Sequence, residues 1–505
     1  MKKISIFLAS MSVLTMTFTS CTLSYDPISE YSELTQGYTD ENGHEVAYKS
    51  RAEALSAYQG IYKLFQDRQE HWYLDAMLIA ESHSDNAYAG TTGAEVVPFE
   101  DNSLDGSNSV ISRDWSRFLE DIATANKFIN NIDSVSDAAL TQTERSQWKA
   151  EAKIFRAIVM FDMVRLWGNI PVITTTAGNI TAENISETYK AYYPKQNTAE
   201  EAYTQIIKDL TEAVSYAPAT EKSDKTILSK DVAYAMLAKA YAEKPLQDYS
   251  KVIEYADKVT ADGYDLEANY GDLFDVNADK TDCKLRNSKE TILETHFTTG
   301  NGNWVTWMFG RDLLKWDDNF TWAKWVTPSR DLAKAFDSEG DVIRKNQSIV
   351  YYACTWSNYY PSSNYAFDYK IRSKANSIIR LRYADILLLK AEAEIMTGDL
   401  GTAATLIDKV RKRAGLADLT SDVTSNKENM IDALLKERRL ELAFEGQRWF
   451  DLCRLGKVES VMNAVYKKDN GRKAQVNQFN ANSYLLPIPQ NAIDQNTNLQ
   501  QNKGY

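Results

Sequence analysis

The feature that most constrains this chain is a segment near its C-terminus, residues 437–457, in which charged side chains are interleaved with apolar ones. The apolar residues in and around this segment recur at intervals that place them on one face of a helix: Leu435, Leu442, Trp449 and Leu452. The spacing predicts one helix with a buried apolar face.

The charges of this segment are paired by position. Glu441 and Glu445 are one helical turn apart, where like charges repel unless cations intervene. Arg438 precedes Glu441 by three residues, and Arg448 follows Glu445 by three residues. This pattern predicts a structural ladder of ion pairs. Gly446 costs about 1 kcal/mol in a helix interior, so we expect another backbone or a bulky ring to pass close to it.

Two carboxylates one turn apart also suggest an alternative, a general acid and base. Retaining glycosidases hold two carboxyl groups about 5 Å apart. A general acid requires surroundings that raise its pKa, whereas an arginine one turn away favours the ionised carboxylate. The structural interpretation of Glu441 and Glu445 is therefore favoured, and we predict that the protein is not an enzyme.

Sequence motifs for metal or nucleophile chemistry are also missing. There is no GxSxG, HExxH or CxxC pair, and the chain has only four histidines. The stretch from Asp275 begins like a calcium loop, but Lys280 stands where glycine is required and Arg286 where the bidentate glutamate belongs. We expect no metal and no cofactor. Cys283 and Cys354 are expected to be reduced, with a disulfide between them as the alternative in an exported protein.

Charge and composition bound the class of protein. The formal net charge is −13 and the pI about 5.1, and no run of Lys and Arg exceeds three residues, which argues against a nucleic-acid partner. With 505 residues and 44% hydrophobic content, the chain is long enough for a large core or several domains.

The N-terminus has the pattern of an exported lipoprotein. Residues 1–20 combine Lys2 and Lys3 with an apolar run too short to span a bilayer, which predicts a signal peptide. Cys21 follows Thr-Ser, as in the lipobox of bacterial lipoproteins, and we predict that it carries the lipid anchor. Residues 21–50 are polar without sustained periodicity and are predicted to form a tether.

Helical periodicity dominates the rest of the chain. It predicts a mainly α fold in which helix pairs stack as a tetratricopeptide-like solenoid, with repeats at about 51–263 and 371–505. The predicted helices are 51–69, 115–132, 147–166, 199–217, 230–243, 246–260, 380–397 and 400–414. Gly168 and Pro171 are stop signals for the third of these helices.

Residues 264–370 interrupt the repeats with weak periodicity and many tryptophans, and we interpret them as a variable ligand-binding insertion. Rings flanked by Gly and Asn are expected to be exposed and to stack on a ligand. A loop near residue 85 is expected to face them. The candidate ligand-binding residues are Asp85, Asn86, Tyr88, Trp304, Trp307, Trp316, Trp322 and Trp356; Trp325 is expected to lie in the core.

Four blocks, in order along the chain, resemble the SusD/RagB family of outer-membrane nutrient-binding lipoproteins. The segment from Glu437 to Leu452 resembles the C-terminal hallmark of that family, and residues 380–393 resemble the helix preceding it. Residues 151–171 resemble the N-terminal block, and residues 486–505 resemble the ending of family members. The blocks frame nearly the whole chain and leave the insertion to diverge.

The resemblance implies a single SusD-like body over residues 51–505 and a location on the cell surface, anchored in the outer membrane through Cys21. It also implies that the protein captures an oligosaccharide or similar nutrient and covers a TonB-dependent, SusC-like barrel, without turnover. The alternative is a helical-repeat lipoprotein that acts only in assembly and binds no ligand. An exposed aromatic platform favours the first hypothesis, because sugars stack on such rings.

Overall fold

The computed structural model describes residues 38–39, 45–90, 93–176, 185–308, 325–354 and 357–505. The chain forms two compact units, Met1–Ala47 and Tyr48–Tyr505. In the first unit, β1 (Tyr38–Thr39) pairs antiparallel with β2 (Glu45–Val46). The predicted signal peptide and the anchor at Cys21 lie outside the described residues. All that follows concerns the second unit.

The second unit begins with α2 (Arg51–Asp67), whose first turn is capped by the Ser50 side chain. Two π-helical turns, η1 (Glu70–Leu74) and η2 (Leu78–Ser82), flank α3 (Asp75–Met77) and continue the buried chain. The short elements β3 (Ala87–Tyr88) and α4 (Val97–Asp101) follow. The predicted helix at 51–69 is confirmed within two residues.

The longest helices form an antiparallel pair, α5 (Ser109–Asn131) and α6 (Gln142–Trp167), joined through η3 (Ile132–Ser134). A capping box between Thr141 and Glu144 starts α6, and Gly168 ends it with a φ of 70°. Both helices and the stop signal at Gly168 agree with the sequence prediction.

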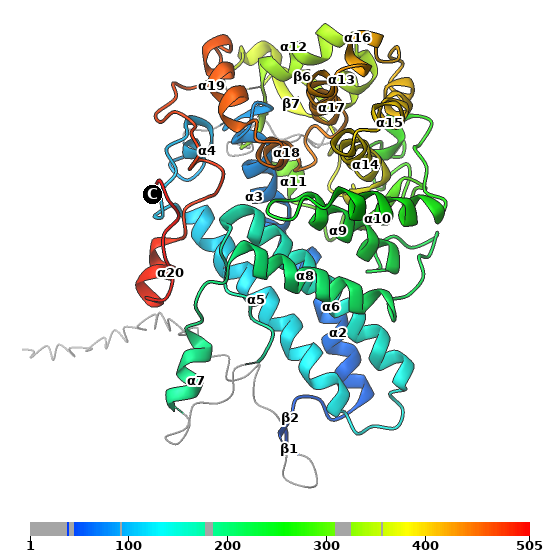
Figure 1. The fold of residues 1–505 in the computed structure, drawn as a ribbon, viewed down its shortest axis with the longest axis vertical. Helices are drawn as coiled ribbons and strands as arrows, with labels where there is room; N and C mark the ends of the chain where they lie inside the picture. The colour runs from blue at the N-terminus through cyan, green and yellow to red at the C-terminus, as the bar shows by residue number, and fades with distance from the viewer. Residues whose placement is uncertain (1–37, 40–44, 91–92, 177–184, 309–324, 355–356) are drawn as a thin grey trace, which may run out of the picture. The chain divides into compact units, whose positions relative to one another are not determined.

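Further helices stack on this pair in succession (Figure 1). They are α8 (Ala199–Val214), α9 (Lys230–Ala242), α10 (Tyr249–Ala261), α14 (Tyr383–Thr397), α15 (Leu400–Arg413), α16 (Ser421–Thr424) and α17 (Lys427–Glu441). The short helix α7 (Ile185–Tyr192) lies apart from this stack in Figure 1. Ala238 and Val252 pack on Leu389 and Ala393 of α14, so the second set of repeats continues the first across the insertion. The mainly α fold built of stacked helix pairs is confirmed.

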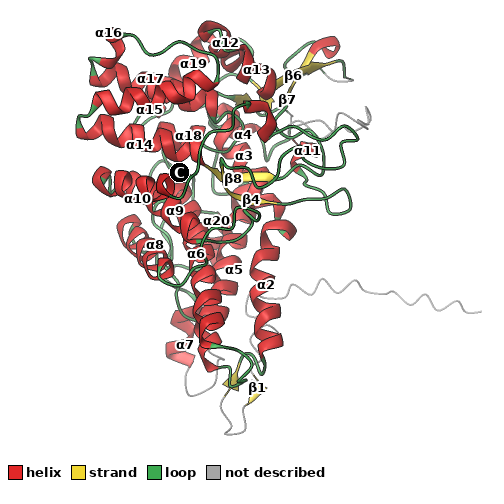
Figure 2. Cartoon of the chain, turned by 90° about the vertical axis from the view of Figure 1, so that its right-hand side faces the viewer, coloured by secondary structure: helices red, strands yellow, loops and turns green. Residues whose placement is uncertain are grey.

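The insertion carries more regular structure than its weak periodicity indicates (Figure 2). Its helical elements are η4 (Tyr270–Leu273), α11 (Val305–Met308), α12 (Arg330–Glu339), α13 (Val342–Ser348) and η5 (Ser362–Asn364). Its strands are β4 (Thr291–Thr295), β5 (Thr327–Pro328), β6 (Ile349–Tyr352) and β7 (Tyr365–Asp368), followed by β8 (Ile378–Arg382). Antiparallel pairs β3–β5, β4–β8 and β6–β7 connect the insertion to itself and to both flanking regions.

The C-terminal region contains α18 (Arg448–Arg454), α19 (Val458–Lys468) and α20 (Gln490–Gln495). The predicted single helix over 437–457 is wrong, because α17 ends at Glu441 and a turn precedes α18. Phe444 and Gly446 in this turn have φ of 60° and 72°. Among the described residues, no atom lies within 4 Å of the position that a Gly446 Cβ would occupy, so the conformation, and not a close neighbour, requires glycine there.

Of the helices in the described ranges, none is both long enough and apolar enough to cross a membrane.

Candidate ligand-binding site

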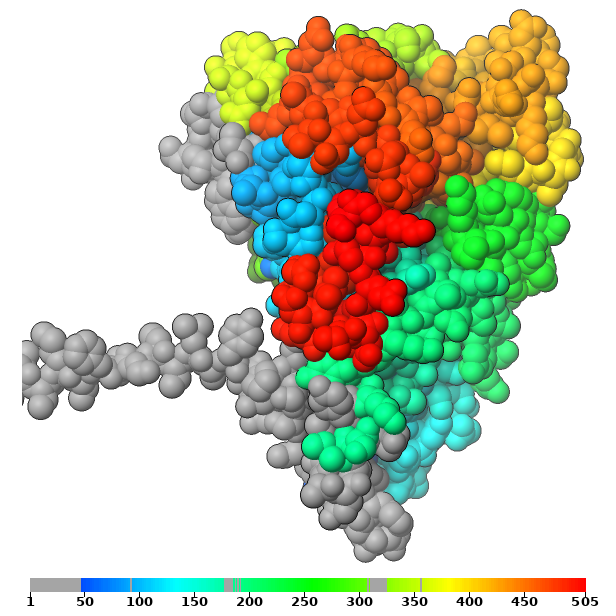
Figure 3. Space-filling model, turned by 60° about the vertical axis from the view of Figure 1, so that its left-hand side comes forward, coloured from blue at the N-terminus to red at the C-terminus, as the bar shows by residue number. Residues whose placement is uncertain are grey.

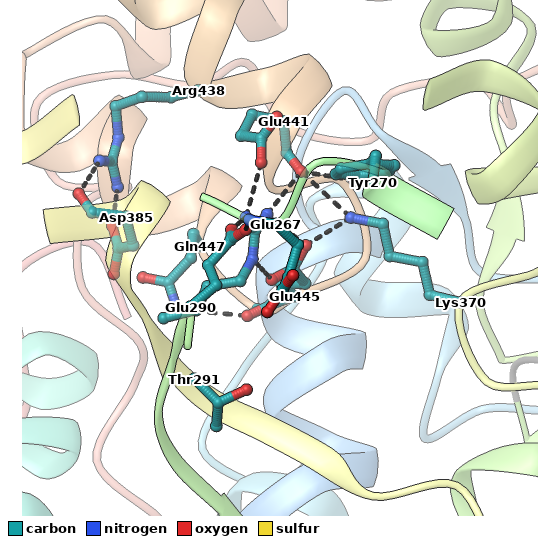
Figure 4. A network of polar contacts seen from close by, with 12 residues as sticks. Glu267, Tyr270, Glu290, Thr291, Lys370, Asp385, Arg438, Glu441, Glu445 and Gln447 are labelled. Carbon is teal, nitrogen blue, oxygen red and sulfur yellow. Dashed lines mark hydrogen bonds and ion pairs between the residues drawn. The ribbon is translucent and has the colours of Figure 1, made fainter. Parts of the chain in front are cut away.

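The turn between α17 and α18 is held by a buried ion network centred on Arg382. Figure 4 shows its members Glu290, Glu441, Glu445 and Lys370. The guanidinium of Arg382 donates to Glu290 Oε1 at 2.7 Å, to Glu441 Oε1 at 2.6 Å and to both carboxylate oxygens of Glu445 at 2.6 and 2.8 Å. Lys370 also pairs with Glu445. The insertion, β8 and the hallmark segment therefore meet in one set of charges.

The electrostatics of Glu441 identify it as a permanent anion. Burial alone raises the pKa of its carboxyl group, but Arg413, Arg382 and Arg344 outweigh that effect and hold the pKa well below its ordinary value. Arg344 Nη1 lies 3.1 Å from Glu441 Oε2, and Arg413 also pairs with this carboxylate. A carboxyl group with these partners cannot serve as a proton donor near neutral pH, which supports the structural interpretation.

The arginines expected to neutralise Glu441 and Glu445 have other partners. Arg438 donates to Asp451 at 2.9 Å and to Asp385 at 2.7 Å, and Arg448 donates to both oxygens of Asp85 at 2.7 and 2.9 Å. The predicted ion network exists, but its pairing was wrong because the helix breaks between the two glutamates.

The loop near residue 85 is part of the interior. Asp85 is 2% exposed, and Asn86 and Tyr88 are fully buried. Asn86 Oδ1 accepts from Arg439 Nε at 2.8 Å, and Tyr88 donates to Asp469 at 2.9 Å. All three residues therefore lack the solvent exposure that contact with a ligand would require. Their polar groups are hydrogen-bonded to residues that are far away in the sequence.

The buried ring of Tyr88 belongs to a tyrosine cluster, which also contains Tyr351, Tyr359, Tyr360 and Tyr365. Tyr88 and Tyr359 stack with ring centroids 4.7 Å apart and planes 7° apart. Tyr351 meets the edge of Tyr360 at 6.1 Å and is 36% exposed, so it carries the cluster to the surface. Burial raises the pKa values of the hydroxyl groups of Tyr88 and Tyr351, which keeps them neutral hydrogen-bonding groups.

Trp304, the first tryptophan of the insertion, is 37% exposed. Its backbone N–H donates to Gln69 Oε1 at 2.8 Å, and the preceding Asn303 side chain donates to the carbonyls of Ser373 and Asn376, each at 3.0 Å. These hydrogen bonds hold the backbone at Asn303 and Trp304, and the Trp304 ring lies at the surface. Trp325, expected in the core, is only partly buried. Of the other candidates, Trp316, Trp322 and Trp356 and the side chain of Trp307 lie outside the described part of the chain.

The segment from Asp275, which departs from the calcium-loop pattern, has a structural role. Asp275 Oδ1 accepts from Arg372 at 3.0 Å, and Arg286, at the position of the missing glutamate, donates to the Phe297 carbonyl at 2.6 Å. Within the described ranges, no cluster of three or more His, Cys, Asp or Glu side chains could hold a metal ion.

Comparison with known proteins places the chain in a family. A family model described as "SusD family" matches residues 277–505, and a second, described as "Starch-binding associating with outer membrane", matches residues 39–242. The two models together cover the second set of repeats and most of the first. This chain belongs to the SusD family. The segment from Glu437 to Leu452, whose turn is held by the buried network around Arg382, lies within the residues that the SusD family model matches.

Individual relatives agree with the family over nearly the whole length. SusD-like protein P2 of Formosa agariphila is 27% identical, with 91% of this chain and 94% of that protein covered. The crystal structure of a SusD homolog from Bacteroides thetaiotaomicron superposes with a TM-score of 0.75 over 95% of this chain and 99% of that one, at 21% identity. A structure described as a laminarin-binding SusD-like protein has a TM-score of 0.69 at 23% identity, covering 91% and 100% of the two chains.

The sequence contained a signal for the tyrosine cluster, but the predicted ligand-binding residues of the insertion included only tryptophans. Two adjacent tyrosine pairs, 351–352 and 359–360, stand in the aromatic-rich insertion, and in the structure they bring Tyr360 within 4.3 Å of the Arg330 guanidinium. The cluster gathers rings from β3, β6 and β7 and from the loop between these last two strands.

Proposed function

We propose that this SusD-family protein is a cell-surface binding lipoprotein, which captures an oligosaccharide or polysaccharide nutrient and delivers it to a TonB-dependent, SusC-like barrel in the outer membrane. The observation that carries this proposal is the presence of two exposed rings, Trp304 at 37% and Tyr351 at 36% exposure. Sugar rings stack their C–H faces on such side chains. An adaptor that only assembles with other proteins has no need of them.

The comparisons add support to a glycan as the ligand. One of the matching family models is described as starch-binding, and one structural neighbour as laminarin-binding. Starch and laminarin are both neutral glucans. The linkages of these two glucans differ. The two descriptions therefore support a glycan as the ligand, and a binding experiment has to determine the linkage. Trp307, Trp316, Trp322 and Trp356 remain proposed ligand contacts from the sequence.

We infer binding without turnover, and the partners of one pair of buried carboxylates support this inference. The paired carboxylates Glu441 and Glu445 both bind Arg382, and the lowered pKa of Glu441 argues against this carboxyl group as the general acid of a glycosidase. The glutamates maintain the turn of the hallmark segment, and the exposed rings carry the recognition.

The test is calorimetry of detergent-purified full-length protein against a panel that includes laminarin and starch oligosaccharides. Trp304→Ala and Tyr351→Ala should each weaken binding of the cognate glycan about tenfold, because one stacking contact contributes about 0.5 to 1.5 kcal/mol. Tyr216→Ala is the matched control, since Tyr216 is 61% exposed in the turn after α8. Wild-type affinity in both site variants would place the ligand elsewhere.

The delivery step has its own test. Gentle detergent extraction from the native host, followed by mass spectrometry, should recover the protein with a TonB-dependent barrel, and a stable complex of this kind buries more than about 2,000 Å². A solitary monomer would contradict the transporter partnership. A barrel complex that binds no glycan would instead favour the adaptor hypothesis.

A further inference from the structure

A polar pocket of about 440 Å³ opens between α19 and the segment that follows it. Its lining includes Tyr466, Lys467, Asp469, Arg472 and Lys473. This segment packs beside α4, where the Val476 N–H donates to the Asp101 carbonyl at 2.8 Å; Figure 3 shows the orange surface of the segment bordering the blue surface of the N-terminal region. Residues from the two ends of the second unit thus meet beside the pocket.

The pocket contains a buried guanidinium with unused donors. The side chain of Arg472 is 1% exposed, and its Nη2 donates to the Ser84 carbonyl at 2.9 Å. Its Nε lies 3.9 Å from Asp469 Oδ2, too far for a hydrogen bond, and neither Nε nor Nη1 has an acceptor in the described part of the chain. Buried charged donors without acceptors are costly, and each one calls for an explanation.

Other donors surround Arg472. The Tyr466 hydroxyl is buried and donates to no acceptor among the described residues, and the Arg472 guanidinium lies 5.6 Å from its ring centroid. Burial raises the pKa of Tyr466, so the hydroxyl keeps its proton and remains a donor. Lys467 and Lys473 add ammonium groups to the lining. The arrangement is complementary to an oxyanion.

The acidic groups nearby are already engaged. Asp469 accepts from the Tyr88 hydroxyl at 2.9 Å and from the Gly471 N–H at 3.0 Å. Glu100 accepts from the backbone N–H of Lys473 at 2.8 Å but does not line the pocket. The lining has three cationic side chains and one anionic one, so its local charge is positive although the whole chain carries a formal charge of −13.

We propose that this pocket binds an acidic group, a carboxylate or a sulfate ester, carried by the glycan ligand. The inference rests on the proposed function and deepens it, because it assigns the ligand to the acidic glycans. Lys473 Nζ lies 5.7 Å from the ring centroid of Tyr359, which stacks on Tyr88, so the pocket borders the tyrosine cluster. Charge recognition in the pocket then adds to stacking on Tyr351, the exposed ring of the cluster.

Binding of three oligosaccharides to full-length protein in detergent tests the proposal: trigalacturonate, a sulfated carrageenan hexasaccharide and neutral laminarihexaose. We expect an acidic oligosaccharide to bind at least tenfold more tightly than the neutral one, and its affinity to fall as NaCl rises from about 0.05 to 0.5 M. The comparison of the first two probes decides between carboxylate and sulfate.

The variants locate the effect. Lys473→Gln, a change near the surface, should weaken acidic binding several-fold, and Arg472→Lys, which keeps the charge but loses the planar guanidinium, by roughly tenfold. Lys468→Gln is the matched control, because Lys468 is exposed on α19 and does not line the pocket. Laminarihexaose should bind all variants equally.

The outcomes separate this inference from the proposed function. Equal or tighter binding of laminarihexaose, or wild-type acidic binding in both pocket variants, overturns the acidic-ligand assignment and leaves glycan capture intact. If no glycan binds, glycan capture and the assignment both fail. Thermal stabilisation by sodium sulfate, compared between wild type and Lys473→Gln, then decides whether the pocket holds a free oxyanion in place of a glycan group.

Discussion

At the scale of single residues, Glu441 shows how a carboxylate can be buried without being reactive. It is fully buried between three arginines from three separate segments, α13, β8 and α15. Removing one partner of such a network leaves the opposite charges underpaired in the interior, which is more costly than the network is stabilising.

Glu441→Gln should therefore lower the free energy of unfolding by about 3 to 5 kcal/mol. Glu254→Gln provides the matched control, because the carboxylate of Glu254 is 40% exposed in its pairs with Lys251 and Lys258 and should contribute about 0.5 kcal/mol. Urea unfolding measures both. Equal stability of the two variants would mean that Glu441 is not part of the scaffold.

Two other buried carboxyl groups make stability depend on pH. Burial raises the pKa of Asp368 to about 8 and that of Glu81 to about 7. Because the folded state holds protons that the unfolded chain has already released, the stability contribution is present at pH 4 and is lost as pH rises through these values. The lowered pKa values of Asp85 and Glu441 act oppositely, and their contribution is lost as pH falls below about 4.

Asp368→Asn should reduce the loss in free energy of unfolding that accompanies a rise in pH from about 5 to 8. Each group with a raised pKa reduces the free energy of unfolding by up to about 1.4 kcal/mol per pH unit between its unfolded and folded pKa values, and the amide does not titrate. Urea unfolding at pH 5, 7 and 8 is the measurement. Asp432→Asn, at a carboxylate that is 67% exposed, is the control and should leave the slope unchanged. An unaltered slope in Asp368→Asn would refute the assignment.

At the scale of elements, strong periodicity made the helices predictable, whereas the break after α17 was not. The paired helices α5 and α6 begin and end at caps that the sequence displays, such as Gly168. The turn at 442–447 is set by Arg382 and Lys370, which are about 60 to 75 residues away in the chain and cannot be read from local spacing. The same reason hid Asp85, whose partner Arg448 is 363 residues away.

Substitutions at Gly446 and Gly60 distinguish the effect of backbone conformation on stability from the effect of close packing. Gly446→Ala should destabilise the fold by about 1 to 2 kcal/mol, because its φ of 72° is unfavourable for any residue with a Cβ. Gly60→Ala, inside α2 with no described atom within 4 Å of the added Cβ, should stabilise by about 0.5 to 1 kcal/mol. Opposite shifts in thermal midpoint are expected. A loss of stability in both variants would mean that close packing matters at these positions.

At the scale of the whole molecule, the scaffold and the candidate surface sites lie on different segments of the second unit. The helix pairs predicted from the sequence form a scaffold. The exposed rings and the polar pocket lie on segments for which the sequence predicted no helix. Periodicity identifies cores, but a surface site depends on which distant segments meet, as Tyr88 and Asp469 do across 381 residues. The sequence therefore predicted the scaffold well, whereas local patterns did not show that Asp85, Asn86 and Tyr88 are buried.

The attachment of this scaffold to a membrane is predicted from the sequence alone, and it can be tested independently of any ligand. Cys21→Ala removes the thiol that would carry the diacylglyceryl group, and with it the acyl chains whose buried methylenes each contribute about 0.8 kcal/mol to anchoring. Fractionation of cells should then move the protein from the membrane pellet to the soluble fraction. Cys453→Ala is the matched control, because Cys453 lies in α18 within the folded unit, and it should stay with the membrane. Retention of the Cys21→Ala protein in washed membranes would contradict lipid anchoring at this position.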